Sequence, residues 1–91
     1  MNVQDELDMH GTRFEQAVSE AVQFIDSCVA RKLQKVRIVT GKGLHSPSGQ
    51  SVIRPEIIKA VKNHPAVREV DLNPKAKDGG SGAIIIILKS S

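Results

Sequence analysis

The stretch KVRIVTGKG, residues 35–43, decides the fold of this 91-residue chain. Its first six residues are mostly β-branched and favour a strand, and the glycines that flank Lys42 end that strand in a turn. Val36, Ile38 and Thr40 would share one face of the strand, because side chains alternate. Lys42 has little to pack against between two glycines, so its ammonium group is either idle on a tight turn or part of an anion site.

Helices and strands alternate around this stretch. A short run at 6–10 predicts a first strand, and apolar residues at three- and four-residue spacing predict a helix over 13–32. A second helix should carry Pro55 in its first turn and stop before Pro65. Two further strands are predicted downstream, at 66–72 and 83–89. The order β-α-β-α-β-β indicates an α/β two-layer sandwich with a four-stranded mixed sheet.

The direction of the strands predicts where their loops meet. A strand–helix–strand crossover makes its two strands parallel, so the first two strands finish at the same end of the sheet. With a parallel third strand and an antiparallel last strand, three loops would converge at that end. Their candidate site residues are Asp8, His10 and Gly11; Gly41, Lys42 and Gly43; and Gly79, Gly80 and Gly82. Open α/β sheets commonly bind ligands at this end.

The residue types at these loops suit phosphodiester chemistry. Asp8 and His10 lie two apart on a strand and would face the same way, so the carboxylate could fix the tautomer of the imidazole. Lys42 and the amides beside it could hold a phosphate. Two other interpretations stay open: Asp8 and His10 as a structural pair, or Asp8 as a ligand of a divalent metal. No clear metal site made only of protein ligands is visible, since Asp78 is the only other carboxylate near these loops.

Composition narrows the class of protein. The net charge is +3 and the pI is about 9.3, which permits a nucleic-acid partner without requiring one. Cys28 is the single cysteine, which excludes an internal disulfide and favours a reducing, intracellular location, cytoplasmic or nuclear. The polar start of the chain is unlike a signal peptide, and AIIIIL is too short to cross a membrane. We expect one domain over residues 1–91, with a core at about 6–89.

Three short motifs carry a family resemblance. LDMHG at 7–11, VTGKG at 39–43 and GGSGA at 79–83, in this order, resemble the Smr domain, named after small MutS-related proteins. GLHSPSGQSVIRP at 43–55 is similar to a eukaryotic form of the second motif, whereas GGSGA is similar to the bacterial form. The former adds His45 and Arg54 to the positions of interest.

The resemblance implies a fold similar to the C-terminal domain of translation initiation factor three, and nuclease activity. It points to Asp8 and His10, and to the GKG of 41–43, as functional positions. It also implies RNA or DNA as partner, with roles in cleavage of mRNA on ribosomes or in nicking of DNA. It leaves the need for a metal cofactor open.

The resulting hypothesis is an endonuclease domain. Asp8 would orient His10, His10 would move protons, and Lys42 would hold the phosphate. Four further cations could extend the contact with the strand: Arg37, Arg54, Lys75 and Lys77. The chain has only two aromatic residues, so binding should depend on the backbone and on salt. RNA is slightly favoured over DNA.

Two alternatives remain open. One is a module that binds nucleic acid or the ribosome without cutting, and a weaker one is a small-molecule phosphate binder. The sequence also predicts something about Ile84–Ile87. If both helices lie on one face of the sheet, some of these isoleucines would be exposed on the other, and a partner or an upstream segment would cover them.

Overall fold

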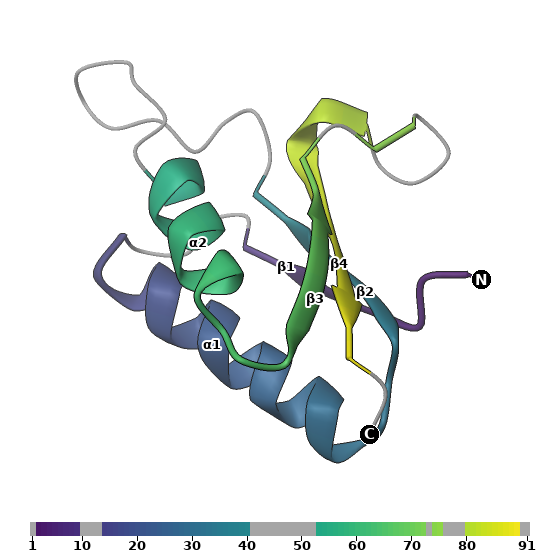
Figure 1. The fold of residues 1–91 in the computed structure, drawn as a ribbon. Coiled ribbons are helices and arrows are strands. Elements are labelled where there is room, and N and C mark those ends of the chain that lie inside the picture. The colour runs from purple at the N-terminus through teal and green to yellow at the C-terminus, as the bar shows by residue number, and fades with distance from the viewer. Residues whose placement is uncertain (1, 10–13, 41–52, 73, 76–79, 90–91) are drawn as a thin grey trace.

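The computed structural model describes residues 2–9, 14–40, 53–72, 74–75 and 80–89 (Figure 1). It contains two helices, four strands and a short 3₁₀ turn before the last strand. Their bounds are β1 (Asp5–Asp8), α1 (Phe14–Ala30), β2 (Lys35–Val39), α2 (Ile53–Lys62), β3 (Val67–Asp71), η2 (Gly80–Gly82) and β4 (Ala83–Leu88). The α/β order predicted from the sequence is confirmed.

The four strands form one mixed sheet in the order β1-β2-β4-β3. β1 and β2 are parallel, and β4 is antiparallel to both β2 and β3. The predicted directions are therefore correct: β1, β2 and β3 all finish at the end of the sheet where β4 starts. We call this the loop end, and the opposite end, where β2 and β3 start and β4 finishes, the far end.

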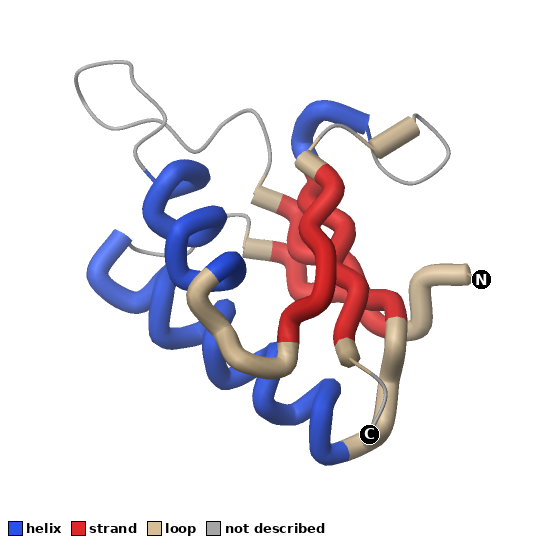
Figure 2. The backbone as a smooth tube through the Cα atoms, viewed as in Figure 1, coloured by secondary structure: helices blue, strands red, loops and turns tan. Residues whose placement is uncertain are grey.

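Both helices pack against the same face of the sheet (Figure 2). α1 turns a stripe of small and aliphatic residues inward at the expected helical spacing: Ala17, Ala21, Ile25 and Cys28. They meet Val36 and Ile38 of β2, Ile84 and Ile86 of β4, and Ile57 and Val61 of α2 in one core. Each fully buried isoleucine of this kind contributes about 1.5–3 kcal/mol to stability.

The other face of the sheet has no helix over it in the described part of the chain, yet Ile85 on that face is covered. Ile85 is 3% exposed and Ile84 and Ile86 are fully buried, so the expectation of exposed isoleucines is wrong for these three. Ile87 is half-buried. Ile85 is aligned with Arg37 on β2, and the alkyl part of a long charged side chain can cover aliphatic surface while its charged end stays in water. Covering Ile85 therefore requires no partner.

α1 ends two residues earlier than predicted, in a left-handed turn. The Lys32 N–H donates to the Val29 carbonyl and the Leu33 N–H donates to the Cys28 carbonyl, each at 3.0 Å. Lys32 has a φ of 61°, in the region that glycine usually occupies at this position. Val29, expected on the buried stripe, is 41% exposed instead.

None of the helices in the described residues is long and apolar enough to span a membrane.

Candidate nucleic-acid site

Backbone hydrogen bonds hold three chain segments together at the loop end. The Met9 N–H donates to the Val39 carbonyl at 2.9 Å, which joins the end of β1 to the end of β2. The Thr40 N–H donates to the Gly82 carbonyl at 3.0 Å, which joins β2 to the start of β4. The segments that carry the three sequence motifs therefore leave or enter the sheet side by side.

Asp8 is the last residue of β1 and lies on the face of the sheet that the helices do not cover. It is exposed and aligned with Val39 of β2. Met9 is fully buried in the core, so side chains still alternate one residue beyond the strand. The sequence interpretation assigned no role to Met9. An apolar residue between two polar ones was the available signal that it is a core residue.

Thr40 is a link between two motifs that the sequence interpretation missed. It is 1% exposed, and its hydroxyl lies 3.4 Å from the same Gly82 carbonyl that its N–H binds. A hydroxyl on a strand face that otherwise carries Val36 and Ile38 was the signal for a buried polar contact. Thr40 fixes how the chain leaves β2, immediately before the glycine–lysine–glycine stretch.

The connection from β3 to β4 closes on itself at the loop end. The Gly80 N–H donates to the Lys75 carbonyl at 3.2 Å. Gly80 has a φ of 67°, which a glycine adopts without strain, and a Cβ added there would meet no atom within 4 Å. Lys75, whose side chain is exposed, and Gly80 are therefore neighbours shortly before the start of β4.

Arg37 lies away from the loop end. It is the middle residue of β2, and its Nε donates to Glu6 Oε1 at 2.9 Å on the face that the helices leave open. Its side chain is only 23% exposed. Arg54 belongs to the first turn of α2, and its side chain lies outside the described residues.

The other predicted site residues also lie outside the described part of the chain: His10, Gly11, Gly41, Lys42, Gly43, His45, Lys77 and Gly79. The geometry of the proposed Asp8–His10 couple and its distance from Lys42 thus stay predictions. Among the described residues, no group of three or more His, Cys, Asp or Glu side chains is placed to hold a metal ion.

Solved structures of similar shape include two small MutS-related domains. The chain superposes on YdaL, a stand-alone small MutS-related protein from Escherichia coli, with a TM-score of 0.81 over 93% of this chain and 64% of that one. It superposes on the Smr domain of Thermus thermophilus MutS2 with a TM-score of 0.78 over 93% and 98%. Both are 24% identical to this chain, so they establish the fold.

Similar sequences occur as parts of longer proteins. An uncharacterised protein of Treponema pallidum is 40% identical over 85 residues, which are 93% of this chain and 41% of that protein. A protein of Enterococcus faecalis named endonuclease MutS2 is 33% identical over 93% of this chain and 10% of its own length. This chain therefore spans less than half of these relatives.

The Smr domain family model matches residues 7–89, which include all three motifs and every strand except the start of β1. With the sheet order, the strand directions and the joined loop end already in place, the match settles the classification. The chain belongs to the Smr domain family.

Proposed function

We propose that this chain is a single endonuclease domain that cuts the phosphodiester backbone of nucleic acid at the loop end of the sheet. The observation that carries the proposal is the pair of backbone hydrogen bonds that brings the ends of β1 and β2 and the start of β4 together. The motifs with Asp8 and His10, with Gly41, Lys42 and Gly43, and with Gly79 to Gly82 begin at these points. Relatives named endonuclease MutS2 support the same activity.

The charge of the connecting segments also supports an anionic substrate. Residues 9–13 follow β1, residues 40–52 follow β2, and residues 72–82 join β3 to β4. They carry four of the thirteen Lys and Arg residues of the chain, but only one of its ten Asp and Glu residues. A local excess of cations raises the concentration of a polyanion at a surface and speeds its association.

In the proposed reaction, His10 exchanges the proton of the attacking or leaving oxygen, and Asp8 orients its imidazole. Lys42 and the amides beside it stabilise the charge that develops on the phosphate. RNA is the preferred substrate, and cleavage of mRNA on ribosomes or nicking of DNA in repair are the settings that fit an intracellular enzyme. The comparison with and without EDTA tests whether cleavage requires a divalent metal.

The test is to assay His10→Ala and Lys42→Ala separately for cleavage and for binding, on matched single-stranded and duplex RNA and DNA, with and without EDTA. Loss of a general acid–base group should reduce the cleavage rate by about 10²–10⁴-fold and leave binding nearly intact. Lys59→Ala, an exposed lysine on α2, is the matched control for Lys42→Ala. Wild-type cutting by both site variants would refute the proposal.

A module that binds nucleic acid or the ribosome without cutting is the second candidate. This candidate predicts that the wild-type protein cleaves none of the substrates, whereas Lys42→Ala still weakens binding. The small-molecule alternative is separated by competition, because an enzyme for polymers should prefer RNA of about 20 nucleotides to a mononucleotide by a wide margin.

A further inference from the structure

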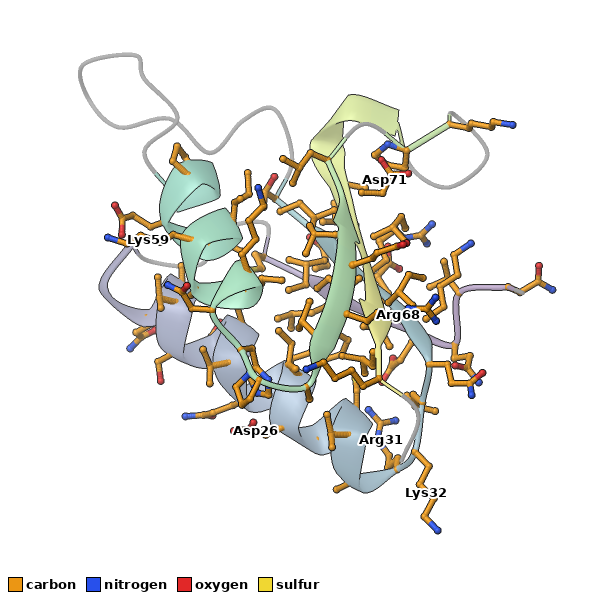
Figure 3. The ribbon with its side chains drawn as sticks, viewed as in Figure 1. Asp26, Arg31, Lys32, Lys59, Arg68 and Asp71 are labelled. Carbon is orange, nitrogen blue, oxygen red and sulfur yellow. The ribbon has the colours of Figure 1, made fainter. Side chains whose placement is uncertain are left out.

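A second basic surface lies at the far end of the sheet, opposite the loop end. It contains five cations of which four are exposed and one, Lys35, is half-buried. They are Arg31, Lys32, Lys35, Arg68 and Lys89, which we call the far-end surface. Figure 3 shows Arg31 and Lys32 at the end of the molecule away from Asp71, which lies near the loop end, with Arg68 between them on β3.

Strand pairing brings these residues together from distant parts of the sequence. Lys35 at the start of β2 is aligned with Ile87 near the end of β4, and the Leu88 N–H donates to the Gln34 carbonyl at 2.8 Å. The Lys89 N–H donates to the Ala66 carbonyl, next to the start of β3. Arg68 sits where the register of β3 against β4 shifts, and there it is exposed. Lys35, Arg68 and Lys89 thus lie near one half-buried isoleucine, Ile87, while Arg31 and Lys32 follow the end of α1 at the same end of the domain.

Acidic groups neutralise only part of this surface. Asp5 pairs with Arg31 at 2.6 Å, Glu69 is aligned with Ile87, and Lys35 has an interaction partner of its own. Lys32, Arg68 and Lys89 are exposed and form no ion pair within the described residues. Farther along the same open face, Asp8 and Asp71 are exposed at the loop end of their strands, so the loop end carries carboxylates as well as cations.

We infer that the far-end surface is a second contact for a nucleic-acid strand that is held at the loop end, so that the domain has a two-part binding footprint. The identification of this ligand as nucleic acid rests on the proposed function. A phosphate backbone requires only well-placed cations, whereas a protein–protein interface usually concentrates its binding energy in a few buried anchor residues. Ile87 is half-buried among charges and provides little apolar anchoring area. From Lys35 to Thr40 the strand rises about 17 Å, a distance that a short oligonucleotide cannot cover but a long one can.

The length of the probe therefore tests the inference. Lys32→Asn with Lys89→Gln removes two charges, with asparagine chosen because it tolerates a positive φ. Lys59→Gln with Lys62→Gln removes the same charge from α2 and is the matched control. Affinities are measured for single-stranded RNA of about 20 and about 4 nucleotides over a range of salt concentrations.

The far-end pair should weaken binding of the long RNA by about three- to tenfold and reduce its salt slope by about 1.4, while leaving the short RNA unaffected. The control pair should change the affinity for the long RNA by less than twofold. Equal losses in both double variants would mean that only net charge matters, and would overturn the inference.

Other outcomes separate this inference from the proposed function. If the long RNA binds through the far-end surface but is never cut, the inference stands and the enzyme assignment fails. If it is cut and bound equally well by the far-end variant, only the inference fails. Tighter binding of a polyglutamate peptide than of RNA with equal charge would assign the surface to an acidic protein and overturn it. Absence of any RNA binding by the wild type would overturn both.

Discussion

The imidazole of His64 connects the two helices of the domain, with its Nε2 2.7 Å from Asp26 Oδ1 on α1. Its Nδ1 accepts a hydrogen bond from the Ala66 N–H at 3.1 Å, so Nδ1 carries no proton and the Nε2–H donates to the carboxylate. His64 thus holds the turn from α2 into β3 against α1.

We expect His64→Ala to lower the free energy of unfolding by about 1–2 kcal/mol, because the half-buried Ala66 N–H loses its acceptor. Asp26 is 63% exposed, so Asp26→Asn should cost less, about 0.5 kcal/mol or under. Urea unfolding of both variants measures the difference. Equal losses in the two variants would show that the contact with α1, and not the bond to Ala66, carries the effect.

Lys32→Gly should stabilise the domain. Glycine removes the strain of a positive φ, and the gain exceeds the entropy that glycine adds to the unfolded chain. The expected net increase is about 0.5–1 kcal/mol, read from thermal or urea unfolding. Lys32→Ala is the control, since it removes the charge but keeps the Cβ and should bring no such gain.

Gly80→Ala should lower stability by about 1–2 kcal/mol although the space around the new methyl group is open, because the cost is conformational. Gly80→Asn should lose less, since asparagine tolerates a positive φ better. If both variants were equally destabilised, a steric clash and not the backbone conformation would be the cause. Comparing nucleic-acid affinity of the asparagine variant with its stability then separates a binding role of Gly80 from its role in the turn.

Asp5 should make stability depend on acidic pH. The hydrogen bond from Arg31 and a weaker contribution from the Glu6 N–H lower the pKa of Asp5 below 3.8. A lowered carboxyl pKa stabilises the fold fully above the unfolded value, and this contribution is lost as pH falls through the folded value. The gap in urea midpoint between wild type and Asp5→Asn should therefore be constant above about pH 5 and shrink below pH 3.8. A gap that stays the same down to about pH 2 would contradict this account.

Cys28 should be unreactive while the domain is folded. Burial raises the pKa of its thiol, and the nearby Arg31 only partly opposes this, so little thiolate is present at neutral pH. Reaction with a disulfide reagent should follow unfolding, and its rate should rise in urea along the unfolding curve. Fast labelling without denaturant would show that the C-terminal turn of α1 opens in the native state.

The elements that the sequence predicted best are those with strong periodicity. The apolar stripe of α1 and the alternation of β2 each depend on neighbours along one chain segment, and strand directions followed from the crossover rule. The central place of β4, the burial of Met9 and the covering of Ile85 depend instead on pairing between distant segments. Arg37 illustrates the limit, because nothing local indicates that its partner would be Glu6.

The candidate site was predictable only as a location. Chain direction and three motifs brought Asp8, Thr40 and Gly82 to one end of the sheet. The far-end surface was not foreseen, since Lys32, Arg68 and Lys89 belong to no common motif. Pairing of β3 with β4 brings Arg68 and Lys89 to the same end of the sheet, and the end of α1 adds Lys32.

The inner position of β4 has a consequence for biosynthesis. Residues 83–88 are synthesised after the other three described strands. In the sheet, however, they lie between β2 and β3, which do not pair with each other. In a nascent chain that still lacks this stretch, β3 has no strand to pair with. The two helices then have only part of the sheet to pack against. The sheet therefore cannot be completed until residues 83–88 are available to pair with β2 on one side and β3 on the other.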